Sequence, residues 1–181
     1  MHQDAERILI NEKEIDEITT ALAERINADY KDSQKPIILV TILKGSLIFA
    51  SDLMRKLDLP VELEFMKVSS YGAGTKSSGE IRIHLDLARE NLEKYNIIVI
   101  EDIVACGRTV CRLTALLKNR NANSVKTCTL LDKPSRREVD FVPDYVGRQI
   151  EDEFVIGYGL DYDEKYRNLP YVAILKREIY S

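Results

Sequence analysis

The chain has 181 residues, of which 45% are hydrophobic and 31% charged, and its 26 basic and 30 acidic residues give a net charge of -4. This length suits one domain with a sizeable buried core, and the composition excludes intrinsic disorder. Because the charges are spread along the chain, we expect no basic face for nucleic acid and no polybasic patch for a membrane. A small-molecule function is favoured.

The ends and the cysteines suggest where the protein works. No apolar stretch approaches the roughly 20 residues of a membrane-spanning helix, and the N-terminus lacks the apolar core of a signal peptide. The three cysteines, Cys106, Cys111 and Cys128, have no CxxC spacing, which argues against a disulfide framework and a zinc site. We expect a cytoplasmic protein with reduced thiols.

Helical and strand patterns alternate in the first half of the chain. Apolar residues three or four apart predict an amphipathic helix over 14–29. The continuous apolar run 37–43 predicts a strand buried on both faces, and a tight turn separates it from a second helical pattern over 47–57. Residues 61–68 predict another strand, and 69–79, rich in Gly, Ser, Thr and Lys, predict a long loop.

The second half continues the alternation. Residues 96–100 predict a third strand, 108–118 a helix with one apolar face, and 125–131 a fourth strand. Strands that alternate with helices favour an α/β fold, in which a parallel sheet is connected by right-handed crossovers.

The last third of the chain is less regular. Short strands are predicted at 154–157 and 171–175, with the polar stretch 161–168 between them. The chain has no internal repeat and no Pro/Gly/Ser linker, so we expect this tail to form a small hood rather than a separate domain. We therefore expect a single domain over 1–181, with a core of about 14–135 and a hood built from N-terminal residues and about 136–181.

Residues 97–109 carry the strongest functional signal. An apolar strand pattern ends in Glu101-Asp102, and a turn of small residues then opens a helical pattern. Ligands of open α/β sheets bind at the carboxyl ends of strands, and N–H groups at a helix start bind phosphate. Acids beside a phosphate need a hard cation between them, so the pair predicts Mg²⁺, held with several waters and bridged through substrate oxygens. The alternative is a solvated acidic turn, which this context disfavours.

The turn residues fit a phosphate cradle. Gly107 permits close approach of the backbone, and the Thr109 hydroxyl can bind an anion, although capping of the helix would explain it equally well. Cys106 has no histidine nearby in the sequence to act as its base. We interpret it as a small packed residue rather than a nucleophile.

This segment closely resembles the phosphoribosyl-pyrophosphate motif of the type I phosphoribosyltransferases, in particular their hypoxanthine-guanine branch, and further matches run from Leu43 to Arg167 in family order. The resemblance implies the type I phosphoribosyltransferase fold. It implies transfer of the 5-phosphoribosyl group from phosphoribosyl pyrophosphate to N9 of the 6-oxopurine bases hypoxanthine or guanine, giving IMP or GMP plus pyrophosphate. It also implies Mg²⁺ as cofactor and a homodimer or homotetramer.

The resemblance assigns roles to the sugar-phosphate residues. Leu43-Lys44-Gly45 matches the pyrophosphate loop, with a non-proline cis peptide before Lys44, and Ser70-Tyr71 begins the loop that closes over the site. Glu101 and Asp102 match the residues that contact the ribose hydroxyls, directly or through metal-bound water. The 5-phosphate cradle corresponds to Cys106, Gly107, Arg108 and Thr109.

Other matches concern the purine and the leaving group. Lys133 matches the lysine that reaches the purine 6-oxo group, although a surface lysine before a turn is an equal alternative. Phe154 matches the aromatic ring that stacks on the purine, and Val155 the residue whose main chain contacts the purine edge. Asp161 is placed near a second Mg²⁺ and Arg167 near pyrophosphate.

Two positions depart from the family pattern. Ala105 stands where the family has its general-base Asp, and Cys106 where it has Thr or Ser. The positions assigned to catalysis are thus Ala105, Lys133 and Arg167. General-base help is worth about 10² to 10⁴-fold, so we expect turnover reduced by that order and nucleotide binding largely retained. The alternatives are a non-catalytic nucleotide-binding regulator on the same fold and a deliberately substituted enzyme.

Overall fold

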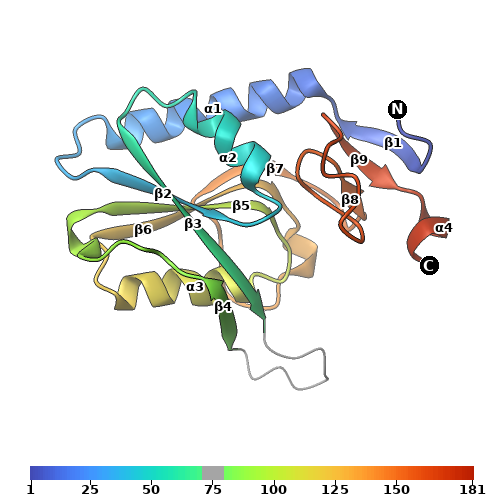
Figure 1. Cartoon of the computed structure of the whole chain (residues 1–181). Helices are drawn as coiled ribbons and strands as arrows, with labels where there is room; N and C mark the ends of the chain where they lie inside the picture. The colour runs from blue at the N-terminus through green and yellow to red at the C-terminus, as the bar shows by residue number, and fades with distance from the viewer. Residues whose placement is uncertain (71–79) are drawn as a thin grey trace.

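The computed structural model describes residues 1–70 and 80–181. A large sheet with helices on both faces forms one part of the molecule, and a small sheet that includes both termini lies at one end (Figure 1). The predicted closing loop begins at Ser70, the last residue of a strand, and its next residue, Tyr71, lies outside the described residues.

Within residues 1–70 and 80–181, the large sheet has six strands in the order β4-β3-β2-β5-β6-β7. Their bounds are β2 Ile37–Ile42, β3 Val61–Ser70, β4 Ile81–Leu85, β5 Asn96–Val104, β6 Ser124–Asp132 and β7 Tyr145–Gln149. Only the β3–β4 pair is antiparallel among the paired strands of this sheet in the described parts of the chain. The predicted α/β class with a mostly parallel sheet is therefore confirmed.

Helices cover both faces of the large sheet. Helices α1 (Glu12–Tyr30) and α2 (Leu47–Met54) lie on one face and α3 (Arg108–Asn119) on the other (Figure 1). The central strand β2 is buried along its whole length because its side chains alternate between the two faces: Leu39 joins the cluster under α1 and α2, whereas Ile38 joins the cluster under α3. The helices predicted over 14–29, 47–57 and 108–118 are confirmed within a few residues.

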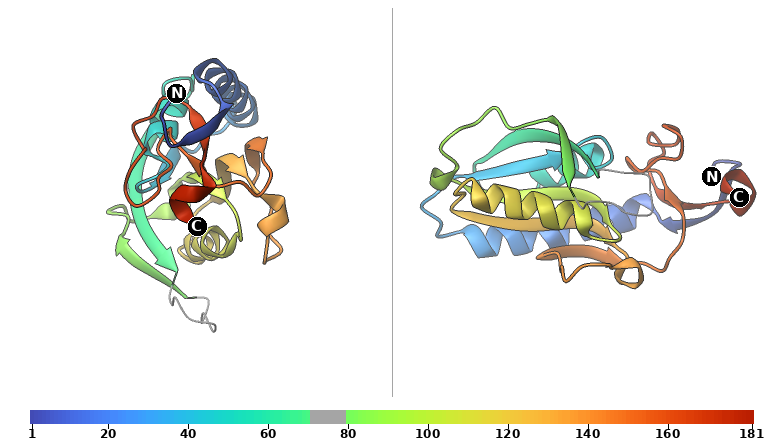
Figure 2. Two further views of the ribbon diagram at one scale, coloured as in Figure 1. Left: turned by 90° about the vertical axis from the view of Figure 1, so that its right-hand side faces the viewer. Right: turned by 90° about the horizontal axis from the view of Figure 1, so that it is seen from below.

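The small sheet joins the two ends of the chain. Strands β1 (Ala5–Ile10), β9 (Val172–Leu175) and β8 (Val155–Ile156) are antiparallel, and the short α4 (Arg177–Tyr180) follows β9. Figure 2 shows this unit, with both termini, projecting beyond the end of the large sheet. The strands predicted at 154–157 and 171–175 are present in shorter form. Strand β1 was not predicted, because its residues Glu6, Arg7 and Ile8 are exposed and form no alternating pattern.

Two boundaries differ from the sequence prediction near the acid pair and the loop. Strand β5 continues to Val104, four residues beyond its expected end, because it keeps pairing with β6 through Glu101–Thr129 and Val104–Asp132. Strand β3 continues through Ser70, where it pairs with Ile81 of the edge strand β4. Long-range pairing thus extends strands into segments that have no apolar pattern.

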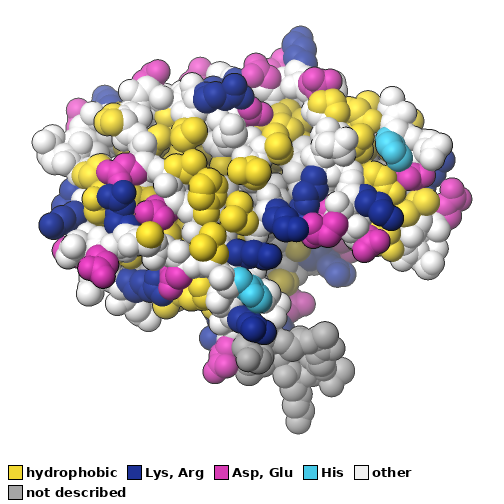
Figure 3. Space-filling view, viewed as in Figure 1, with side chains coloured by type: hydrophobic (Ala, Val, Ile, Leu, Met, Phe, Trp, Pro, Cys, Tyr) yellow, Lys and Arg dark blue, Asp and Glu magenta, His cyan; other side chains and the backbone are white. Residues whose placement is uncertain are grey.

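Charged side chains of both signs are mixed on the surface, as their spread along the sequence predicted. Basic and acidic side chains are interspersed on the face seen in Figure 3, with apolar side chains between them. Across the described ranges, every helix is too short or too polar to traverse a bilayer.

Candidate active site

The acid pair and the predicted pyrophosphate loop lie against each other. A Cβ atom added to Gly45 would sit only 1.8 Å from Asp102 Oδ2, so glycine is required for this contact. The peptide bond between Leu43 and Lys44 is cis, as the family resemblance implies. The parallel pairing of β2 with β5 places the ends of the two strands side by side and so brings the two segments together.

The two carboxyl groups lie in an environment that disfavours negative charge. Burial and the neighbouring Asp102 raise the pKa of Glu101 well above its usual value. Burial likewise raises the pKa of Asp102 to about 6. The Ile103 N–H group donates a hydrogen bond to Asp102 Oδ1 at 2.7 Å, which lowers this pKa and so opposes the effect of burial. Arg167 lowers the pKa of Asp102 and Asp161 raises it, so these residues share one electrostatic field.

This donor set fits a hard cation that is completed by other ligands. Glu101, Asp102 and Asp161 offer carboxylate oxygens, which Mg²⁺ prefers. A cation bound here would offset the cost of keeping Glu101 and Asp102 ionised, which burial imposes on both groups. No group of three or more His, Cys, Asp or Glu within residues 1–70 and 80–181 is arranged to hold a metal alone. A cation here would therefore need oxygens from a substrate or from water.

The turn after β5 opens a cavity beside the acid pair. Gly107 adopts a left-handed conformation (φ 80°) directly before α3, as only glycine does readily. The cavity has a volume of about 200 Å³ and joins the strand residues to the turn and the helix start. Its lining consists of Glu101, Ile103, Val104, Ala105, Cys106, Gly107, Thr109 and Val110. Arg108 points to another partner, Glu138, at 2.7 Å.

A buried ion pair that the sequence did not reveal supports this turn. Arg137 donates a hydrogen bond to the Ala105 carbonyl oxygen at 2.7 Å and forms an ion pair with Asp132. Asp132 is only 3% exposed. Because Asp132 ends β6 beside Val104 of β5, the pair ties the turn to the end of the sheet. The sequence did not predict this role, because two consecutive arginines at 136–137 are typical of an exposed segment.

Lys133 directly follows β6 and lies next to the tail segment that contains Phe154. Its ammonium group donates to the Glu153 carbonyl oxygen at 2.5 Å and lies 3.7 Å from Asp152 Oδ1. Burial lowers the pKa of Lys133, while Asp152 opposes the change. The predicted purine-contacting lysine therefore contacts Glu153, the residue that precedes the predicted stacking residue Phe154.

Phe154 belongs to a small aromatic cluster. Its ring stacks on Tyr180 of α4, with centroids 4.8 Å apart and an interplanar angle of 26°, and meets Tyr162 edge-on at 5.4 Å. Val155 starts β8 and is buried. The role of Tyr180 was not predicted, because a lone tyrosine near a chain end has no local pattern that indicates its partner.

Residues Gly159 to Tyr162 and Arg167, which together match the C-terminal signature of the family, lie over the pyrophosphate loop. A Cβ atom added to Gly159 (φ 97°) would sit 2.1 Å from the Gly45 carbonyl oxygen. Arg167 donates to the Gly159 carbonyl oxygen at 2.8 Å and pairs with Asp161 at 3.1 Å. The predicted residues Gly45, Asp161 and Arg167 are thus brought together from opposite ends of the chain.

Glu164 was not predicted as a site residue, but it connects the basic side chains of the predicted residues Lys44 and Arg167. One carboxylate oxygen lies 2.6 Å from Lys44 Nζ and the other lies 3.1 Å from Arg167 Nη2. Hydrogen bonds from Lys44 and then Arg167 lower the pKa of Glu164. The candidate site therefore contains an anion supplied by the chain itself.

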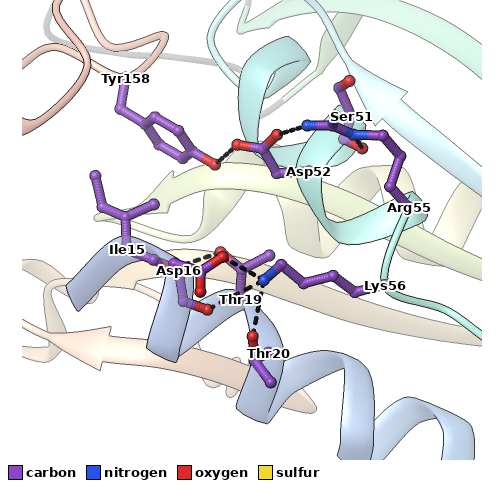
Figure 4. A network of polar contacts seen from close by, with 9 residues as sticks. All are labelled: Ile15, Asp16, Thr19, Thr20, Ser51, Asp52, Arg55, Lys56 and Tyr158. Carbon is purple, nitrogen blue, oxygen red and sulfur yellow. Dashed lines mark hydrogen bonds and ion pairs between the residues drawn. The ribbon is translucent and has the colours of Figure 1, made fainter. Parts of the chain in front are cut away.

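A second cavity, of about 600 Å³, lies between α1, α2 and the segment 158–170. Figure 4 shows Tyr158 pointing at Asp52 of α2, to which its hydroxyl donates a hydrogen bond. Asp52 also pairs with Arg55, and the next residue, Lys56, pairs with Asp16 of α1. None of the predicted site residues that the structure describes lines this cavity. The Tyr158–Asp52 bond nevertheless connects the residue before the C-terminal signature to α2, the helix that follows the pyrophosphate loop.

The chain is similar to known proteins along its whole length. The phosphoribosyl transferase domain model matches residues 4–163. Curated proteins named hypoxanthine-guanine phosphoribosyltransferase are 47% identical over 181 residues, which is 100% of this chain and 99% of the relative, in Staphylococcus epidermidis and in Staphylococcus aureus.

Solved structures agree over the whole fold. A hypoxanthine phosphoribosyltransferase from Staphylococcus aureus superposes with a TM-score of 0.94 at 47% identity, covering 100% of this chain and 97% of that one. A point mutant of the Trypanosoma cruzi hypoxanthine phosphoribosyltransferase, in a ternary substrates complex, gives 0.94 at 41% identity, with 99% and 100% covered. The expected type I phosphoribosyltransferase fold is confirmed. This chain belongs to the phosphoribosyl transferase domain family.

Proposed function

We propose that this chain catalyses purine salvage, transferring the 5-phosphoribosyl group from phosphoribosyl pyrophosphate to N9 of hypoxanthine or guanine and releasing pyrophosphate. The observation that carries the proposal is the contact of Gly45 with Asp102, at one end of a site that also contains the turn 105–107 and Arg167. The full-length similarity to hypoxanthine-guanine phosphoribosyltransferases supports the same reaction.

In this proposal the substrate groups bind to successive parts of the site. The turn and the start of α3 receive the 5-phosphate through backbone N–H groups, and Glu101 and Asp102 face the ribose hydroxyls. Lys44 and Arg167 bind the pyrophosphate, and their positive charges favour its departure. Mg²⁺, for which Glu101, Asp102 and Asp161 are the proposed ligands, would supply charge neutralisation of the phosphate oxygens.

The purine is proposed to lie between Lys133 and the aromatic cluster. Lys133 Nζ donates to a backbone carbonyl in the same segment, and the lowered pKa of this lysine reflects its partly buried position. A lysine in such a place can donate a hydrogen bond to a purine 6-oxo group, while the Phe154 ring offers an apolar face.

Ala105 supplies no group that could accept the proton released at the purine ring. The neighbouring carboxylate Asp132 is engaged by Arg137. We therefore propose that turnover is reduced relative to a family member with Asp at this position, whereas binding of nucleotide is retained. Loss of the hydroxyl at Cys106 removes one further phosphate contact, which the backbone donors and Thr109 partly replace.

A non-catalytic nucleotide-binding regulator on the same fold is the second candidate. Ala105 favours it, since binding without turnover needs no base. The segment around Lys44, Asp161 and Arg167 favours the enzyme, because binding a purine nucleotide alone needs no site for pyrophosphate.

The test is nucleotide formation from phosphoribosyl pyrophosphate with hypoxanthine, guanine or xanthine, measured beside calorimetric titration with GMP and with Mg²⁺. Slow formation of IMP or GMP that depends on Mg²⁺ supports the enzyme. Tight GMP binding with no detectable product contradicts it and supports the regulator. We further propose a cytoplasmic homodimer or homotetramer, on the strength of the family resemblance, which light scattering and cell fractionation would test.

A further inference from the structure

Glu164 occupies the space between the two cations that are proposed to bind pyrophosphate. Its Oε2 lies 2.6 Å from Lys44 Nζ and its Oε1 lies 3.1 Å from Arg167 Nη2. Each oxygen thus engages a different cation, which is how two oxygens of a phosphate group would engage them. The carboxylate comes from the chain itself and reaches both the pyrophosphate loop and the C-terminal signature.

The local backbone supports this placement. Glu164 adopts a left-handed conformation (φ 61°), and its N–H group donates to Asp161 Oδ2 at 2.9 Å. Asp161 also pairs with Arg167 at 3.1 Å. The turn therefore holds the Glu164 side chain over Arg167, yet 63% of this side chain is exposed, so it can move into solvent without disturbing the core.

We propose that the Glu164 carboxylate is an internal counter-anion, which holds Lys44 and Arg167 in the free protein and is displaced when a pyrophosphate group binds between them. The inference rests on the proposed function. It makes Glu164 an autoinhibitory contact: the free energy of breaking its two ion pairs is subtracted from the binding free energy of pyrophosphate or of phosphoribosyl pyrophosphate.

The contrasting possibility is that Glu164 supports binding by positioning Lys44 and Arg167 for the ligand. The two roles predict opposite signs when its charge is removed. Displacement predicts that Glu164→Gln binds pyrophosphate more tightly, because two cations are released from a competing anion. Positioning predicts weaker binding, because the cations lose their support.

The experiment is isothermal titration of the full-length protein with pyrophosphate in the presence of Mg²⁺, and with GMP in parallel. Because exposed ion pairs contribute little, we expect Glu164→Gln to lower the Kd for pyrophosphate by about two- to thirtyfold. GMP carries no pyrophosphate group, so its Kd should not change. The exposure of Glu164 lets the variant fold, which circular dichroism and the thermal midpoint would verify.

Asp163→Asn is the matched control, because Asp163 is the preceding residue, has a similar backbone conformation (φ 51°) and pairs with the exposed Lys165 at 3.7 Å. It removes the same charge and should leave the Kd for pyrophosphate within about twofold of the wild-type value, as expected for an exposed charge. An unchanged or higher Kd in Glu164→Gln, or equal tightening in Asp163→Asn, would overturn the inference alone. If the wild-type protein bound neither GMP nor pyrophosphate, the proposed function would fail with it.

Discussion

Gly45 and Asp102 approach so closely that a methyl group on Gly45 would lie 1.8 Å from Asp102 Oδ2. The two residues are at the ends of neighbouring parallel strands, β2 and β5, and belong to the pyrophosphate loop and the acid pair of the candidate site. If the proposed function holds, substrate recognition depends on this steric relation between the Gly45 backbone and the Asp102 carboxylate.

Gly45→Ala should move the Asp102 carboxylate without unfolding the protein, because the clash is with the end of a side chain that can rotate. Misplacing a positioning group by about 1 Å can cost about 10²-fold, so we expect kcat/KM for phosphoribosyl pyrophosphate to fall by that order. Initial-rate kinetics and thermal unfolding measure the two effects. A large loss of stability with normal kinetics would contradict the account.

Gly159→Ala should have a different effect, since its added Cβ meets the Gly45 carbonyl oxygen at 2.1 Å and the residue has φ 97°. Backbone atoms cannot move aside as a side chain does, and a non-glycine residue in this conformation is strained. We expect a loss of about 1 to 3 kcal/mol in the free energy of unfolding. Urea denaturation measures it, and an unchanged midpoint would show that the contact is not maintained in solution.

Ala105→Asp should raise kcat, because a carboxylate beside the turn cavity would accept a proton or hydrogen bond from the purine. The expected gain is about 10² to 10⁴-fold with little change in the Kd for GMP. Ala105→Asn is the matched control: it adds nearly the same volume but no base, and should give much less. Unchanged nucleotide formation in Ala105→Asp would mean that the reduced turnover is wrongly assigned to this position.

Arg137→Met should destabilise the protein by leaving Asp132 buried without its cationic partner. Breaking a buried ion pair from one side costs about 3 to 5 kcal/mol, and the Ala105 carbonyl oxygen also loses its donor. Chemical denaturation should show this loss. The double variant Asp132→Asn with Arg137→Met should recover part of the stability, because the uncompensated charge is gone; equal or greater destabilisation of the double variant would refute the argument.

Tyr158→Phe should change how stability depends on pH. Burial, and then the bond to Asp52, raise the pKa of the Tyr158 hydroxyl in the folded protein. A raised pKa means that the folded state holds the proton more strongly, so the associated stability is complete below the unfolded pKa of about 10 and is lost as pH rises beyond it.

The measurement for Tyr158→Phe is the free energy of unfolding in urea between about pH 8 and about pH 11. This range includes the ordinary tyrosine pKa of about 10. The wild-type protein should lose stability more steeply over the alkaline part of this range than the variant. Other groups whose pKa is raised in the folded protein, among them Tyr145 and Tyr30, remain in both proteins and contribute to the slope that persists in the variant. Identical slopes would show that Tyr158 does not contribute.

The sequence by itself determined the fold class and the main motif. The spacing of apolar residues in α1 and the apolar run of β2 reflect which face of each element is buried, and that information is local. The same holds for residues 97–109, where an apolar strand, an acid pair and a glycine turn follow one another without interruption. Periodicity and turn chemistry need no knowledge of distant partners.

Only the tertiary structure decided which distant residues meet. Strand β1 forms because Ala5 pairs with Leu175, and no local pattern in 5–10 indicates that partner. Likewise Glu164 becomes part of the site because the C-terminal segment folds back onto the loop that contains Lys44. Such contacts depend on how separate elements pack against one another. Many different local sequences are compatible with the same packing, so these contacts originate in the arrangement of the whole chain.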